Sequence, residues 1–102
     1  MSDQAPAVEQ LSSLPRSERS EFLESIVVAE FKDVLLMGGD EMFPTDQSYF
    51  SLGFTSLRIM EVKTRLEKTL GCTLSTNVLF NSPTIEKLVE YLADEVLADL
   101  IR

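Results

Sequence analysis

One serine in the chain stands where a side-chain hydroxyl has a specific chemical use. Ser56 lies in the stretch YFSLGFTSLRIMEV, residues 49–62, where a glycine-containing segment gives way to an apolar pattern of helical spacing. At a helix start the first backbone N–H groups are unpaired, and the helix dipole places partial positive charge there. A phosphate ester on this hydroxyl would be stabilised by those groups. Taken alone, the local pattern favours an ordinary N-cap, and both uses stay open here.

The residue before this serine bears on the choice. Thr55 is itself a good N-cap, because a threonine hydroxyl accepts a hydrogen bond from an amide of the first turn. If Thr55 caps the helix, Ser56 becomes its first residue and its hydroxyl is free to be modified.

The composition gives autonomous catalysis little support. The chain has no histidine and one cysteine, which excludes the usual zinc sites and Cys/His or Ser/His catalytic pairs. There is no GxGxxG or Walker A loop, and no base to activate Ser56 stands beside it. Cys72 follows Gly71, a helix-ending glycine, and we predict a buried small hydrophobic residue rather than a reactive thiol.

Charge and hydropathy limit the partners. The net charge is −8, with ten acidic and three basic residues among the first 50 and seven and six in the remainder. Such a surface repels nucleic acid, so we expect no nucleic-acid partner. No apolar run approaches a membrane span, no secretory leader is visible, and one cysteine cannot form an internal disulfide. We therefore expect a cytoplasmic protein.

The first half of the chain predicts one long helix and an apolar connection. We expect residues 1–14 to be a flexible lead-in and residues 15–102 to form one domain. A helix is predicted from about Ser17 to the pair Gly38-Gly39, with apolar residues at three- and four-residue steps: Phe22, Leu23, Ile26, Val27, Phe31, Val34 and Leu35. The connection 38–55 must pack onto something, because it contains Met42, Phe43, Tyr49, Phe50, Leu52 and Phe54. For Phe50 and Leu52 we favour a core-covering role.

The second half predicts three more helices. One runs from Ser56 to Leu70 with Gly71 after it; its core stripe is Ile59, Val62, Leu66 and Leu70, while Leu57 and Met60 lie on another face, either partly exposed or buried on a broad core face. A short helix is expected within 72–82. Ser82 and Pro83 then fit the N-cap and first position of a final helix with a four-turn pattern: Ile85, Leu88, Val89, Leu92, Ala93, Val96, Leu97 and Leu100. The fold class is all-α, a four-helix bundle of three long helices and one short one.

Residues 50–92 resemble the phosphopantetheine-binding carrier domains of the acyl carrier protein family. The positions that fall on the family pattern are Phe50, Leu52, Gly53, Ser56, Leu57, Glu61, Arg65, Leu66, Gly71, Leu74, Phe80, Pro83 and Thr84. Residues 11–36, with the motif L-P-x-x-E-R, resemble the first helix of polyketide synthase carriers. The resemblance spans roughly residues 11–97, so an acyl-carrier-like bundle is implied.

The resemblance implies a function for Ser56. It would accept a 4′-phosphopantetheine arm from coenzyme A through a separate phosphopantetheinyl transferase, and the arm would hold acyl intermediates of a polyketide pathway as thioesters. The protein, a non-catalytic monomer, would visit ketosynthase, acyltransferase and tailoring enzymes. Docking to these partners is assigned to the residues around the serine: Phe54, Thr55, Leu57, Arg58, Met60, Glu61 and Thr64.

Two departures from the family pattern keep alternatives open. Thr55 stands where the family usually has aspartate, and the helix after Ser56 is less acidic than in fatty-acid carriers, which favours a polyketide type. One alternative is an aminoacyl or peptidyl carrier of a nonribosomal peptide pathway, against which the L-P-x-x-E-R motif argues mildly. Another is a carrier-like interaction module that is never modified. A last one, an unrelated helical protein with Ser56 as a plain cap, requires the ordered motif series to be coincidence.

Overall fold

The computed structural model describes residues 6–35, 43–81 and 83–101, apart from the side chains of Pro6 and Leu35. Within these ranges the chain is helical and contains no strand, which confirms the predicted all-α class. The elements in chain order are α1 (Pro6–Ser13), α2 (Arg16–Leu35), α3 (Ser56–Leu70), α4 (Thr76–Asn81), α5 (Ile85–Tyr91), the π-helical turn η1 (Leu92–Val96) and α6 (Ala98–Ile101). The expected helix end at Gly38-Gly39 and the position of Met42 lie outside the described residues.

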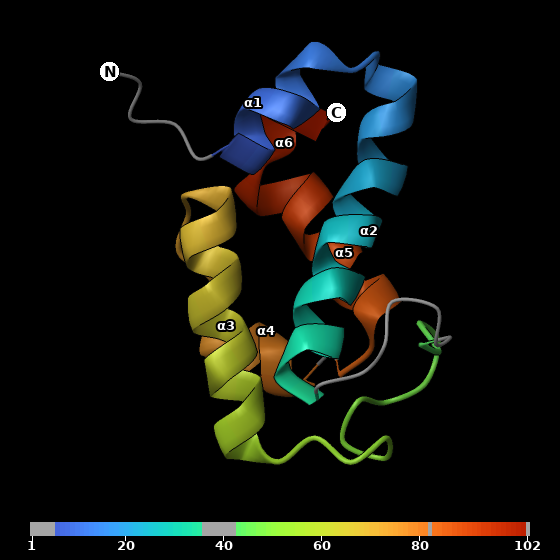
Figure 1. Cartoon of the computed structure of the whole chain (residues 1–102), viewed down its shortest axis with the longest axis vertical. Coiled ribbons are helices and arrows are strands. Elements are labelled where there is room, and N and C mark those ends of the chain that lie inside the picture. Colours follow the sequence, from blue (N-terminus) through green and yellow to red (C-terminus); the bar gives the residue numbers. More distant parts are fainter. Residues whose placement is uncertain (1–5, 36–42, 82, 102) are drawn as a thin grey trace.

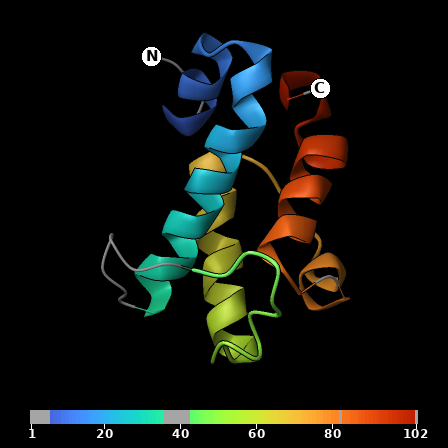
Figure 2. The same cartoon turned by 90° about the vertical axis from the view of Figure 1, so that its right-hand side faces the viewer.

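The long helices pack side by side around one apolar core. Helices α2 and α3 run antiparallel, and the segment from α5 to α6 lies against α2 (Figure 1). Helices α1 and α6 lie at one end of this bundle, and the start of α3 lies at the other (Figure 2). The short α4 connects α3 to α5, as the predicted bundle of three long helices and one short one requires.

Helix α3 has the predicted bounds, and local signals at both ends explain them. Its last turn is closed by Gly71 in the left-handed conformation, with φ 64° and ψ 41°. The amides of Gly71 and Cys72 both donate to the Glu67 carbonyl, which satisfies an otherwise unpaired acceptor. Its buried residues are the four of the predicted core stripe: Ile59, Val62, Leu66 and Leu70.

The prediction of a loose lead-in is wrong for residues 6–13, which form helix α1 packed on α2 and α3. Leu11 is fully buried and Ala7 nearly so, because they are spaced four residues apart and face the core. Three apolar residues, Ala7, Val8 and Leu11, gave too short a pattern to predict the helix. Its burial depends on surfaces that other helices supply.

Arg19 of α2 forms hydrogen bonds with the end of α1 and with the end of α6. Its guanidinium donates from Nε to the Leu14 carbonyl (2.9 Å), from Nη2 to the Ser12 carbonyl (2.9 Å) and from Nη1 to the Leu100 carbonyl (2.7 Å). Carbonyls at a helix C-terminus lack intrahelical donors and carry partial negative charge, so a cation suits them. The arginine of the L-P-x-x-E-R motif therefore joins the end of α1 to the end of α6.

The final helix is not continuous as predicted. It is interrupted at η1, where the Leu97 amide donates to the Leu92 carbonyl at 2.7 Å and Leu97 leaves helical geometry with φ −117° and ψ 32°. The extra residue in this turn rotates the last helical segment, α6. As a result Ile101 is buried, whereas Leu100, which the regular pattern placed in the core, is only partly buried.

The start of the final helix also differs from the prediction. Its N-cap is Thr84, whose hydroxyl accepts from the Lys87 amide at 3.2 Å, and its first residue is Ile85. Pro83 precedes the helix, and Ser82 lies outside the described residues. The Pro83 carbonyl instead accepts from the Tyr49 amide at 2.8 Å, so this residue serves the loop before α3.

Replacing Arg19 by lysine should lower the free energy of unfolding by about 1.5–3 kcal/mol, the range for hydrogen bonds to a charged group. Lysine keeps the charge but lacks the fixed fork that reaches three carbonyls. Urea unfolding measures the loss, with the Lys87→Arg exchange on the exposed face of α5 as the control. An Arg19→Lys protein as stable as the parent would contradict the fastening role.

Candidate functional site

Ser56 occupies the first position of α3 with its side chain exposed. The cap is Thr55: its backbone is extended at φ −89° and ψ 167°, and its hydroxyl accepts from the Arg58 amide at 3.2 Å. Its carbonyl accepts from the Ile59 amide at 2.9 Å. Within the described part of the chain, the Ser56 hydroxyl has no hydrogen-bond partner. The structure thus confirms that Thr55 caps the helix and leaves the serine free.

The loop before Ser56 is held by aromatic packing. Phe31 of α2 contacts the rings of Tyr49, Phe54 and Phe43, with centroids 5.0, 5.2 and 5.9 Å apart. Phe50 stacks on Phe80 of α4 at 5.6 Å. Phe50 and Leu52 are partly buried against the core, which confirms their predicted covering role.

Backbone hydrogen bonds then turn the loop toward α3. The Tyr49 carbonyl accepts from the Leu52 and Phe54 amides at 3.2 and 3.1 Å, and the Phe50 carbonyl accepts from the Gly53 amide at 3.3 Å. Gly53 has φ 106°, a conformation that residues with a Cβ atom rarely adopt. Space is not the constraint there, because an added Cβ would meet nothing within 4 Å. This turn brings Phe54 inward and Thr55 and Ser56 outward.

The predicted docking residues separate into exposed and buried members. Leu57 is 77% exposed and Met60 is 38% exposed, so the interpretation that placed them in the core is wrong. Thr55, Arg58, Glu61 and Thr64 are exposed beside them. Phe54 is the exception: it is 3% exposed and its ring packs on Phe31, so it lies beneath the exposed face that the other predicted docking residues share. A side chain adjacent to a turn points inward or outward according to backbone geometry that the sequence pattern did not disclose.

Three basic residues of α3 form ion pairs with acidic residues. Arg58 Nη1 lies 3.2 Å from Glu61 Oε1, and Lys63 Nζ lies 3.0 Å from Glu67 Oε2. Arg65 reaches across to α2, 3.8 Å from Glu30 and 3.7 Å from Asp33. Burial raises the pKa of the Glu30 carboxyl above its usual value, an effect that Arg65 opposes and Asp33 reinforces. Arg58, the cation beside Ser56, and the more distant Lys63 and Arg65 are therefore all paired with acids of the same chain.

Glu67 and Cys72 belong to the opposite end of α3 and serve packing. The Glu67 carboxylate accepts from the Leu74 amide at 2.8 Å and from Lys63; these bonds lower its pKa. Cys72 is partly buried against the core, and burial, with a smaller contribution from Glu67, raises the pKa of its thiol. A thiol held protonated is a poor nucleophile, in agreement with the predicted packing role.

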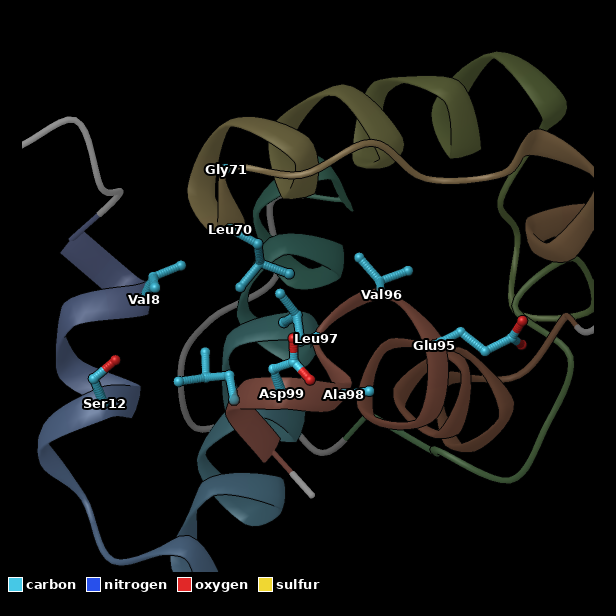
Figure 3. Close-up of a pocket in the computed structure, with 10 residues that line it drawn as sticks. Val8, Ser12, Leu70, Gly71, Glu95, Val96, Leu97, Ala98 and Asp99 are labelled. Carbon is cyan, nitrogen blue, oxygen red and sulfur yellow. The ribbon is translucent and has the colours of Figure 1, made fainter.

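A cavity of about 630 Å³ lies at the end of α3 that holds Leu70 and Gly71 (Figure 3), whereas Ser56 begins the same helix. It is lined by α1, the end of α3, η1 and α6, with Val8, Leu70, Val96 and Leu97 facing the shared space. No residue of the loop before α3 contributes to it. Among the described residues, no group of cysteine, aspartate and glutamate side chains is placed to hold a metal ion, and no helix is long and apolar enough to cross a membrane. The exposed hydroxyl of Ser56 thus remains the candidate site.

Sequence reasoning missed two residues that position this site. Tyr49 is fully buried and its hydroxyl donates to the Leu79 carbonyl of α4. The Pro83 carbonyl accepts a hydrogen bond from the Tyr49 amide. One signal could have indicated the role of Tyr49: it is a single tyrosine among the phenylalanines of the connection, and a buried tyrosine hydroxyl needs a hydrogen-bond partner.

Comparisons with known proteins agree with this geometry. Residues 25–92 match the family described as "Phosphopantetheine attachment site". The chain is 32% identical over 92 residues to polyketide synthase GfsA of Streptomyces halstedii, covering 90% of this chain and 1% of that protein. It is 31% identical over 88 residues to phenolphthiocerol synthesis polyketide synthase type I Pks15/1 of Mycobacterium marinum, covering 86% and 4%. The chain thus spans only a few per cent of these curated relatives.

A solved structure is similar over nearly its whole length. It is described as "A1-type ACP domain from module 5 of MLSA1", with a TM-score of 0.76 and 26% identity. The match covers 94% of this chain and 96% of that one. The similarity therefore includes the bundle, the loop and the start of α3 rather than an isolated motif.

Replacing Thr55 by alanine should lower the free energy of unfolding by about 1 kcal/mol, because the Arg58 amide loses its acceptor. Thr55→Asp should keep the parent stability or exceed it by about 0.3–1 kcal/mol, since a carboxylate caps the helix and suits its positive end. Thermal or urea unfolding measures both. Equal stability of the alanine variant and the parent would show that Thr55 is not the effective cap.

Proposed function

The chain belongs to the phosphopantetheine attachment site family, and from that premise we propose that Ser56 is its attachment residue. The observation that carries the proposal is that Thr55, and not Ser56, caps the start of α3. Thr55 makes the capping hydrogen bond, and the Ser56 hydroxyl is exposed and without a partner in the described structure. The family is non-catalytic and carries its 4′-phosphopantetheine covalently attached.

Attachment would proceed by transfer from coenzyme A on a separate phosphopantetheinyl transferase. Ser56 Oγ forms a bond to the phosphorus next to the pantetheine, and the phosphoanhydride bond breaks. Adenosine 3′,5′-bisphosphate leaves with the electron pair, and the serine proton passes to the transferase or to water. The chain's own contribution is to present the hydroxyl, because no side chain among the described residues forms a hydrogen bond with it.

The helix start would stabilise the attached phosphodiester. The amides of Ser56 and Leu57 have no acceptor within α3, since they belong to its first turn, while the Arg58 amide is occupied by Thr55. Two amides and the positive end of the helix dipole therefore lie beside the anionic group. The Arg58 guanidinium, paired with Glu61, adds a cation nearby.

We assign the cargo to acyl intermediates of a polyketide pathway. Both curated relatives described here are polyketide synthases, and the similar solved structure is described as an ACP domain. The terminal thiol of the arm would hold the acyl group as a thioester. Ketosynthase, acyltransferase and tailoring enzymes would be the successive partners of a monomeric, cytoplasmic carrier domain. Apo protein that accepted amino acids from an adenylation enzyme would favour the aminoacyl alternative instead.

Docking would use the exposed face around Leu57. Leu57 and Met60 form an apolar patch, bordered by the Arg58–Glu61 pair and by Thr64. Because Arg58, Lys63 and Arg65 are already matched by acids of this chain, we infer that partner contact depends mainly on apolar burial. Phe54 is left out of this surface because it is buried.

The Ser56→Ala variant tests the attachment site. Apo protein incubated with coenzyme A and a broad-specificity transferase should gain one arm by intact mass, and Ser56→Ala should stay folded and gain none. Ser51→Ala is the matched control, since Ser51 is an exposed serine of the same loop and should be dispensable for modification. A parent protein that gains no arm, beside a control carrier that does, would sink the proposal and favour the unmodified module.

The Leu57→Ala variant tests the docking face. Leu57 is 77% exposed, so its truncation should change stability by less than about 0.5 kcal/mol. The KM of the transferase for the carrier should nevertheless rise several-fold, and Leu57→Met should restore it. Raising ionic strength should change the parent's KM little, because the ion pairs of α3 are internal. An unchanged KM for Leu57→Ala would remove Leu57 from the contact surface.

A further inference from the structure

Tyr49 lies at the base of the loop that ends at Ser56, and all its polar groups are engaged. Its amide donates to the Pro83 carbonyl at 2.8 Å, and its carbonyl accepts from the Leu52 and Phe54 amides. Its hydroxyl donates to the carbonyl of Leu79 in α4. The side chain is fully buried. One residue therefore connects the loop to α4 and to the segment before α5.

The hydroxyl has a different part from the ring. The ring fills core space against Phe31, Phe50 and Phe54, with centroids 5.0, 5.3 and 6.3 Å away, and a phenylalanine ring would fill the same space. The hydroxyl adds one directional bond to a backbone carbonyl. Burial raises the pKa of this phenol well above its ordinary value, so it stays a donor throughout the neutral range. Packing alone does not explain why a polar group lies here.

The bond bears on Ser56 through a short chain of contacts. Tyr49 holds the Phe54 amide through its own carbonyl, and Phe54 is followed directly by the cap Thr55 and by Ser56. Displacing Tyr49 therefore displaces the residues that set the direction of the serine hydroxyl. Group transfer between two proteins is sensitive to such shifts, because reacting atoms must be held to within a fraction of an ångström.

We propose that the Tyr49 hydroxyl is a positioning group for the modification of Ser56. Its bond to α4 keeps the loop 49–55 in the one geometry that a transferase accepts. The inference rests on the proposed attachment at Ser56 and adds a residue that acts through the loop without touching the arm. In its absence the loop would sample other geometries, and the competent fraction of carrier would fall.

The Tyr49→Phe variant tests this role. The KM of the transferase for the carrier should rise by up to about 10-fold, because losing one neutral hydrogen bond shifts the loop equilibrium by at most about that factor and KM varies inversely with the competent fraction. The kcat should stay within about twofold, because bound carrier has the parent geometry. Hydrogen exchange of the Leu52, Gly53 and Phe54 amides in the apo protein should accelerate by a similar factor. This second readout does not involve the arm.

Tyr91→Phe is the matched control. The Tyr91 hydroxyl also contacts the backbone near α4, accepting from the Ser75 amide at 3.2 Å, but at the other end of that helix and with no bond to the loop. It should leave both KM and loop exchange within about twofold of the parent. Placing 4-aminophenylalanine at position 49 restores a donor at the same point and should recover the parent KM.

The outcomes separate the two proposals. Unchanged KM and loop exchange in Tyr49→Phe, equal effects of Tyr49→Phe and Tyr91→Phe, or failure of 4-aminophenylalanine to recover the parent KM would overturn the positioning role. In each of these cases the parent still gains its arm on Ser56, so the proposed function stands. A parent that gains no arm overturns both, whatever the exchange rates of the loop.

Discussion

The contact of Phe31 with the rings of Phe43, Tyr49 and Phe54 is the interaction on which the exposed end of the bundle depends. Residues 43–55 contain no helix or strand, and they are held in place because Phe43, Tyr49 and Phe54 are buried against Phe31 of α2. Burial of Phe54 and exposure of Thr55 follow from a single turn, for which Gly53 supplies a backbone conformation that other residues avoid. The free hydroxyl of Ser56 is therefore a consequence of packing several residues away.

The opposite end of the bundle is held by a different force. There the Arg19 guanidinium donates hydrogen bonds to carbonyls at the end of α1, in the turn after it and at the end of α6. These segments leave unpaired acceptors because helices end there, and the π-helical turn η1 brings α6 within reach. The arginine of the L-P-x-x-E-R motif therefore has a structural role, which is to join the ends of α1 and α6.

Three cations of α3 are paired with acids of the same chain. Arg65 is matched by Glu30 and Asp33 of α2, and the pairs Arg58–Glu61 and Lys63–Glu67 lie within α3 itself. Such pairs at the surface add little stability but cancel the local field. What distinguishes the face around Ser56 is then the exposed apolar surface of Leu57 and Met60.

The sequence by itself determined the helical class, the bounds and core stripe of α3 and the candidate Ser56, because these depend on periodicity and on chemistry within one turn. It left open whether Thr55 or Ser56 caps α3, and the bond from the Arg58 amide to the Thr55 hydroxyl decided this. It did not determine helix α1, the N-cap at Thr84 or the interruption at η1, since each depends on surfaces or acceptors that distant segments supply. The inward turn of Phe54 and the bond from Tyr49 to Leu79 were decided by tertiary structure for the same reason. The inward direction of Phe54 and the partner of the Tyr49 hydroxyl, 30 residues away in the sequence, are fixed only when the helices pack together.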